Sequence, residues 1–234
     1  MRGCLSVLFI AALFVVGALW FGGPPVASTV LEASLTSSGF TADELDVTVD
    51  ASPPLALVLG RADRVTIRAS GVSWNGLEAE SMVLEMDDVD LFARTAGRAD
   101  GSFAAVELEG PDADPVLVSI ELSGPSDAAA TTIHVDRATV ERIAKAAFRE
   151  QFGVQADAVE LVAPDAVRLT VGGQSVTGRL EVFGDGAIAV SNPLGDAVTL
   201  VAPDPSLPLT LTGLAIDEAG LVLTGTLEVS SLIR

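Results

Sequence analysis

The sequence predicts an α+β fold: a strand-rich, mostly antiparallel domain with one amphipathic helix, preceded by an N-terminal apolar segment. Apolar and polar residues alternate along most of the chain, turn-forming residues interrupt the alternation, and one stretch changes to helical spacing. The 234 residues are enough for one large domain with a substantial core. We expect residues 29–234 to form this single domain, because no long Pro- or Ser-rich linker divides them.

The N-terminal segment predicts export. Arg2 and the amino terminus are positive, and no charged residue occurs from Leu5 to Phe21. This length fits both the apolar core of a signal peptide and a short membrane-spanning helix, which would be the N-terminal apolar helix of the fold. Cleavage before Thr29 and retention as an anchor both stay open. Either way, residues 1–28 bring the body across a membrane, with the positive end in the cytoplasm.

Composition excludes several classes of partner and chemistry. The formal net charge of −19 opposes nucleic-acid binding, which depends on Lys and Arg to displace phosphate counterions. We therefore expect no nucleic-acid partner. The single cysteine, Cys4, lies in the apolar segment, so the body has neither disulfides nor thiol chemistry.

Alternating segments predict the strands and hairpins of the body. Strands are expected at Leu45–Val49, Val65–Ala69, Met82–Met86 and Val116–Leu122. Turn signals are Asn75-Gly76, Ala99-Asp100-Gly101, Gly172-Gly173, Asp185-Gly186 and Asp217-Glu218-Ala219-Gly220. Strands joined by such short turns pair mostly antiparallel.

Two short segments depart from the alternating pattern. Residues 29–37 are expected to form a short helix after the apolar segment. Pro53 to Leu59 predicts a second short helix that begins at a proline, with Gly60 at its C-terminal end.

The clearest helix is expected between Asp136 and Gly153. Asp136 is a suitable N-cap, the helix runs to about Phe152, and Gly153 can end it. Its apolar residues fall on one side, which is the pattern of an amphipathic helix. Because Glu141 and Glu150 dilute the positive face that a membrane-surface helix needs, we expect it to pack across a curved sheet.

Residues for catalysis or metal binding are sparse. His134 is a lone histidine at a strand end, and Lys145, the single lysine, lies on a charged helix face. Zinc would need a His/Cys cluster. We expect no catalytic residue, no metal site and no cofactor. The densest acidic group, Asp87-Asp88-Val89-Asp90, is interpreted as a solvated turn, with calcium binding or glycosidase-like chemistry as the alternatives.

From Ser52 to Ala69 the chain resembles the LmeA-like phospholipid-binding family of bacterial envelope proteins. There, an alternating strand precedes a proline-led apolar helical turn, and a step like Leu59-Gly60-Arg61 leads into the next strand. The aromatic residue common after the proline is replaced here by Pro54-Leu55. The similarity extends in hydrophobic pattern from Thr29 to Arg234. It implies an elongated, mostly antiparallel curved sheet wrapped on a central amphipathic helix, as in tubular lipid-binding proteins, with lipid in an apolar cavity.

The expected function is binding or transfer of phospholipid, or another envelope lipid, by a protein that is not an enzyme. It would lie on the outer face of the bacterial cytoplasmic membrane or in a periplasm-like space, anchored or secreted. The candidate lipid-binding residues are Leu55, Leu57, Val58, Val140, Ile143, Ala147 and Phe148. Two alternatives stay open: an envelope enzyme acting on a glycan or lipid-linked sugar through Asp87, Asp88 and Asp90, and a structural β-domain with a filled core.

Overall fold

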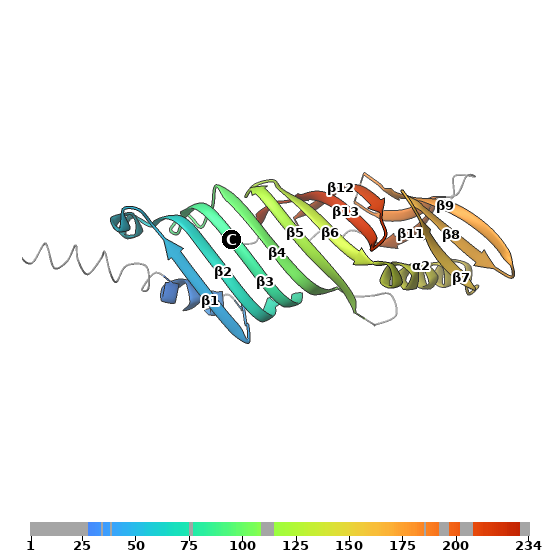
Figure 1. The fold of residues 1–234 in the computed structure, drawn as a ribbon, viewed down its shortest axis with the longest axis horizontal. Coiled ribbons are helices and arrows are strands. Elements are labelled where there is room, and N and C mark those ends of the chain that lie inside the picture. Colours follow the sequence, from blue (N-terminus) through green and yellow to red (C-terminus); the bar gives the residue numbers. More distant parts are fainter. Residues whose placement is uncertain are drawn as a thin grey trace, which may run out of the picture.

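The computed structural model describes residues 28–33, 35–37, 39–74, 77–108, 115–184, 186–191, 197–201 and 208–229. These residues form an elongated body in which two sheets follow one another along the long axis (Figure 1). The predicted signal peptide or anchor lies outside them, apart from Ser28. Within these ranges, no helix has both the length and the hydropathy that crossing a bilayer would require.

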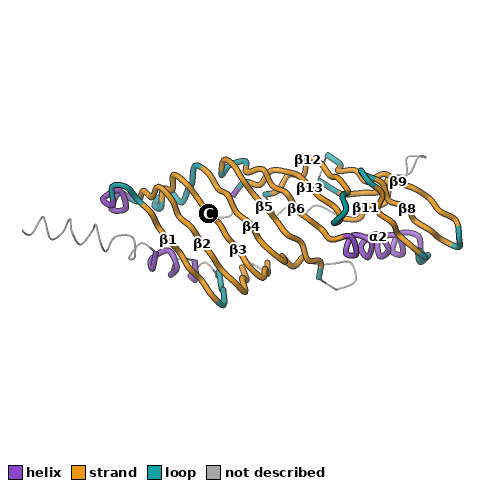
Figure 2. The backbone as a smooth tube through the Cα atoms, viewed as in Figure 1, coloured by secondary structure: helices purple, strands orange, loops and turns teal. Residues whose placement is uncertain are grey.

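Strands dominate the described chain, and helices are few (Figure 2). Residues 28–33 and 35–37 are helical, as predicted for 29–37. The other elements, in order, are β1 (Glu44–Asp50), η1 (Pro54–Leu59), β2 (Arg61–Trp74), β3 (Leu77–Asp90), β4 (Arg98–Leu108), β5 (Val116–Pro125), β6 (Ala129–Asp136), α2 (Arg137–Phe152), β7 (Ala158–Val162), β8 (Ala166–Val171), β9 (Gln174–Val182), β10 (Ile188–Ser191), β11 (Ala197–Val201), β12 (Leu209–Ile216) and β13 (Gly220–Leu227).

In both sheets every neighbouring pair of strands is antiparallel. The larger sheet has eight strands in the order β1-β2-β3-β4-β5-β6-β13-β12, so the last hairpin returns to lie beside β6. The smaller sheet has five strands in the order β11-β10-β9-β8-β7. The predicted strands within β1, β2, β3 and β5 and their antiparallel pairing are confirmed.

Strand register gives the eight-stranded sheet one apolar face and one polar face. We call the first the inner face; one row across it consists of Val47, Ile67, Leu84, Gly101, Leu122, Thr131, Gly225 and Leu211. The adjacent row belongs to the outer face and consists of Thr48, Thr66, Glu85, Asp100, Ser123, Ala130, Thr226 and Thr210. Because successive side chains point to opposite faces, the alternation in the sequence segregates apolar from polar groups.

Two predicted turns are wrong. Ala99-Asp100-Gly101 lies inside β4, where strands pair on both sides. Gly101 allows β3 to approach closely, since a Cβ there would come within 2.8 Å of the Val83 carbonyl oxygen. The acidic run 87–90 is the end of β3 and not a turn. The chain turns just after it, where the Asp90 carboxylate accepts the amide hydrogens of residues 92 and 93.

Other turns follow the prediction. Gly172 and Gly173 join β8 to β9 with φ of 57° and 77°, a left-handed conformation that glycine adopts without steric cost. Between β12 and β13, the Asp217 carboxylate accepts the amide hydrogens of Ala219 and Gly220 at 2.8 and 2.9 Å. Residues 75–76 and 185 lie outside the described ranges.

The two predicted internal helices are confirmed at their ends. η1 follows Pro53 and ends at Gly60, whose φ of 74° is left-handed. Asp136 caps α2 by accepting the Thr139 amide hydrogen at 2.9 Å, and Gly153 ends α2 by donating to the Arg149 carbonyl at 2.9 Å.

The position of α2 differs from the arrangement expected for it. The helix contacts β6 and β13 of the larger sheet and β7 and β11 of the smaller one. It therefore lies at the junction of the two sheets (Figure 1). A sheet wrapped on a central helix is not confirmed; the mostly antiparallel α+β architecture is.

Removing the Asp136 cap is expected to weaken α2. Asp136→Ala should lower the free energy of unfolding by about 1 kcal/mol at neutral pH, because one helix amide loses its acceptor. Hydrogen bonding from Thr139 lowers the pKa of Asp136 below 3.8 in the folded state, so the ionised form is the one that the fold favours. This contribution is present above the unfolded pKa and lost as the pH falls through the folded pKa.

Chemical denaturation at neutral pH and near pH 3 measures both effects. Asp136→Asn is the matched control, because the amide oxygen still caps the helix but does not titrate. Equal stability loss in Asp136→Ala and Asp136→Asn at neutral pH would contradict the capping role.

Candidate functional site

The inner face is the main apolar surface of the eight-stranded sheet. At its β1–β2 edge, Val49 and Val65 are fully buried, each 1% exposed. Three residues on the central strands remain partly exposed instead: Leu84 on β3, Phe103 on β4 and Ile120 on β5. We call these three the central inner-face residues.

The central inner-face residues are neighbours by strand register. Phe103 pairs with Ile120, and Ile120 pairs with Ile133 on β6. Leu84 pairs with Gly101, which adds no side chain beside it. The last hairpin extends the same face with partly buried Leu209, Leu211, Leu214 and Leu227. The result is a band of aliphatic and aromatic groups that spans the sheet, a surface chemically suited to hydrocarbon chains.

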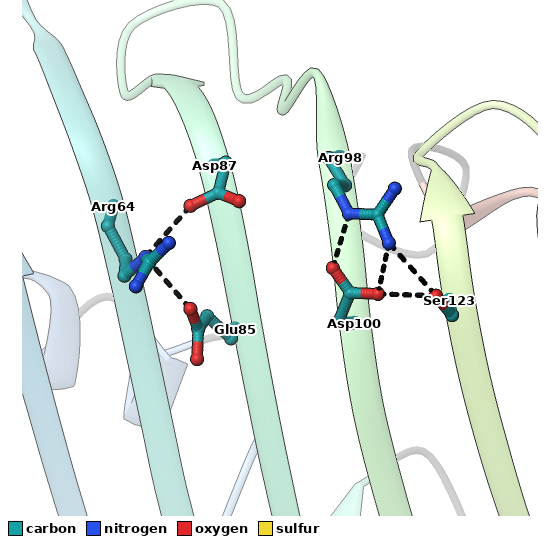
Figure 3. Close-up of polar contacts among 6 residues, drawn as sticks. All are labelled: Arg64, Glu85, Asp87, Arg98, Asp100 and Ser123. Atoms are coloured by element: carbon teal, nitrogen blue, oxygen red, sulfur yellow. Dashed lines mark hydrogen bonds and ion pairs between the residues drawn. The ribbon is translucent and has the colours of Figure 1, made fainter.

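The outer face carries charge and offers no comparable apolar surface. Arg64 on β2 pairs through Nε with Glu85 Oε1 at 2.8 Å and Asp87 Oδ1 at 2.9 Å on β3 (Figure 3). The hydrogen bond and the charge of Asp87, followed by the charge of Glu85, raise the pKa of Arg64 above its ordinary value. Asp87 is thus bound to a cation across the β2–β3 pair.

A second outer-face cluster joins β4 to β5. Arg98 donates to Asp100 through Nε at 2.6 Å and through a terminal nitrogen at 2.7 Å, and also to Ser123 Oγ at 3.0 Å (Figure 3). The hydrogen bond from Arg98 and then that from Ser123 lower the pKa of Asp100. A carboxylate held ionised in this way accepts hydrogen bonds and is a poor proton donor.

Two pockets on the outer face have linings that mix polar and apolar side chains. One, of about 460 Å³, is lined by carboxylates of Glu85, Asp100 and Glu121 along with neighbouring side chains. The other, of about 280 Å³, lies beside Ser119 and His134.

The smaller pocket brings together residue types used in nucleophilic catalysis. Ser119 and His134 are direct partners across β5 and β6, and Asp136 and Asp217 also line the pocket. Both carboxylates, however, accept backbone amide hydrogens: Asp136 from Thr139, and Asp217 from the β12–β13 turn. No hydrogen bond links Ser119 to His134 in the described structure, so the arrangement is not that of a catalytic triad.

Two carboxylates of the acidic run at the end of β3 also make structural contacts. Asp87 binds Arg64, and Asp90 accepts the amides of the following turn. Asp88 has a φ of 53°, a left-handed backbone conformation. Within the described ranges, no group of three or more His, Cys, Asp or Glu side chains is arranged to hold a metal ion.

The predicted lipid-binding residues fall into two separate groups. On α2, Val140, Ile143 and Ala147 are buried, and Phe148 is partly buried. The Phe148 ring packs on that of Phe152 with centroids 4.7 Å apart. These side chains pack the junction of the two sheets.

The other group belongs to η1, near the opposite end of the body (Figure 1). Leu57 packs partly buried against the core, whereas Leu55 and Val58 are exposed. The structure therefore does not bring the two groups into one site, and their contact with lipid stays a prediction. Sequence reasoning missed the central inner-face residues, although alternation along β3 and β5 had already placed Leu84 and Ile120 on strands.

A family model described as LmeA-like phospholipid-binding matches residues 20–226. The chain belongs to the LmeA-like phospholipid-binding family. No curated protein and no solved structure gave a significant match. The LmeA-like match includes both sheets and α2, so the whole described architecture, and not one motif, carries the relationship. Membership supports lipid binding as the general function, in a family defined by binding and not by catalysis.

Proposed function

We propose that this protein binds phospholipid in the bacterial cell envelope and holds its acyl chains against the inner face of the eight-stranded sheet. Membership of the LmeA-like family supports phospholipid as the ligand. The single observation that supports the inner face is its apolar band, in which Leu84, Phe103 and Ile120 are left partly exposed. Contact with acyl chains would remove this surface from water, and such burial is favourable in proportion to area.

The polar outer face favours the same assignment. Its carboxylates and ion pairs would lose hydration on contact with hydrocarbon, which is costly. Acyl chains therefore have one suitable face, and the headgroup would remain at its edge in water. The N-terminal sequence supports placement outside the cytoplasm, and retention of residues 1–28 would hold the body beside a membrane. Passage of lipid between membranes would use the same reversible binding.

The experiment is photocrosslinking of the purified full chain with a phospholipid that carries a diazirine in its acyl chain. Peptides containing Leu84, Phe103 and Ile120 should carry the crosslinked lipid, and lipid extracted from the protein as purified should be phospholipid. Fragmentation assigns each crosslink to a single residue, and the reference on the outer face is the neighbouring residue Val83, on the same strand as Leu84. Crosslinks confined to residues 1–28 would contradict the proposal, because they would report only lipid around the apolar segment.

A further inference from the structure

One end of the body carries a contiguous group of exposed apolar side chains. We call it the apolar tip: Leu55, Val58 and Leu59 of η1, and Phe92 of the turn after β3, with 47%, 54%, 68% and 76% of their surfaces exposed. Single exposed apolar residues are normal on a protein surface, but clusters mark contact sites.

Two separate segments build the apolar tip and are fixed to one another. The Phe92 ring lies on Gly60, where a Cβ would clash with it, and the Leu91 amide donates to the Gly60 carbonyl at 2.7 Å. Leu57 and Leu91 are partly buried and pack against the core. These contacts hold η1 and the turn together, with the apolar side chains of both segments exposed.

Arginines flank the apolar tip. Arg61 follows Gly60 directly and Arg94 lies two residues beyond Phe92, and both are exposed. Neither side chain forms an ion pair or hydrogen bond with any part of the chain that the structure describes. Two nearby carboxylates accept backbone amide hydrogens, Asp63 from Ser52 at 2.6 Å and Asp90 from two turn residues, and neither forms an ion pair with these arginines in the described structure. Cations beside exposed apolar groups complement an anionic bilayer surface.

The place where the described chain begins also favours a membrane as the partner of the apolar tip. The described chain begins at residue 28, in the helix at the end of the body where η1 also lies (Figure 1). In the sequence, Leu5 to Phe21 precede that point without a charged residue. An apolar segment that leaves from this end would turn the apolar tip, and not the five-stranded sheet, toward a membrane.

We propose that the apolar tip inserts into the surface of an anionic phospholipid bilayer, with Arg61 and Arg94 at the headgroups. This goes beyond lipid binding on the inner face and does not depend on it. The tip orients the elongated body with its η1 end on the bilayer and its five-stranded sheet away from it.

Site-specific fluorescence on the full chain tests the proposal. With Cys4→Ser as the background, Leu59→Cys carries an environment-sensitive dye at the apolar tip. Val176→Cys is the matched control, since Val176 is 58% exposed on the five-stranded sheet. On phosphatidylcholine vesicles containing phosphatidylglycerol, the dye at 59 should shift to the blue and be quenched by lipids with a shallow spin label. The dye at 176 should do neither.

The arginines are tested in the same labelled protein. Arg61→Gln with Arg94→Gln should lower the ratio of inserted to free tip by roughly thirtyfold on these vesicles, since each cation contributes about 1 kcal/mol near an anionic surface. A dye at 59 that stays in water on anionic vesicles overturns the proposal. So does a blue shift that needs no vesicles and grows with protein concentration, which would mean that a second copy covers the tip. Photocrosslinking of the lipid acyl chain to Leu84 and Ile120 tests the inner-face proposal separately. A failure of one proposal can therefore be told from a failure of the other.

Discussion

Ile120→Asn should lower the amount of phospholipid bound per protein by about tenfold or more. An amide among acyl chains lacks a hydrogen-bond partner, and burying it costs about 1–3 kcal/mol, where 1.4 kcal/mol is a factor of ten in affinity. Ile120 lies between Phe103 and Ile133 by register, at the middle of the apolar band. Because it is only partly buried, the protein should remain folded with the loss of about 1–2 kcal/mol of stability.

The matched control for this variant is Leu117→Asn on the same strand. Leu117 is 46% exposed and lies on the outer face, so the same chemical change there should leave lipid binding intact. Bound lipid is measured by extraction and mass spectrometry, and folding by circular dichroism and thermal melting. A folded Ile120→Asn variant that keeps its full complement of lipid would show that acyl chains do not lie on the inner face. Leu84→Gln offers a second site if Ile120→Asn fails to fold.

Local signals in the sequence predicted the helices and the strands within β1, β2, β3 and β5. Asp136 and Gly153 mark the ends of α2 because caps act within one helical turn, and Pro53 and Gly60 bound η1 for the same reason. Alternation identified strands such as β1, since a half-buried sheet imposes a period of two on the sequence.

Features that depend on distant contacts were not predicted. Asp100-Gly101 has the composition of a hairpin turn, but close packing against β3 and pairing with β5 place it inside a strand. Nothing local to α2 or η1 indicates that they lie far apart, because that separation results from the division of the strands into two sheets. Likewise, alternation shows that Leu84 faces inward but not that it stays partly exposed, which depends on what the other strands cover.

The junction between the two sheets depends on Arg137, the first residue of α2. Its guanidinium donates to the Leu161 carbonyl on β7 at 3.0 Å and to the Asp217 carbonyl in the β12–β13 turn at 2.8 Å. One side chain therefore links the smaller sheet to the last hairpin of the larger one. The positive end of a helix is an unfavourable place for a cation, so the helix itself does not account for an arginine here. The hydrogen bonds to the Leu161 and Asp217 carbonyl oxygens account for it instead.

Arg137→Ala should lower the free energy of unfolding by about 2–3 kcal/mol, because two carbonyls lose a charged donor and one of them is partly buried. Arg137→Lys should recover only part of this loss, since a single ammonium lacks the planar fork that reaches both oxygens. Arg137→Met is the matched control for packing, because it keeps the apolar stem without the donors.

Urea denaturation measures the total effect, and hydrogen exchange locates it. Exchange should rise in β7 and in the β12–β13 turn, while the amides that join β2 to β3 stay protected, because no contact of Arg137 reaches them. Exchange that rises equally along the whole chain would mean that Arg137 supports the fold in general and not the junction. Localised exchange with intact lipid binding would instead show that the inner face functions without a rigid connection to the smaller sheet.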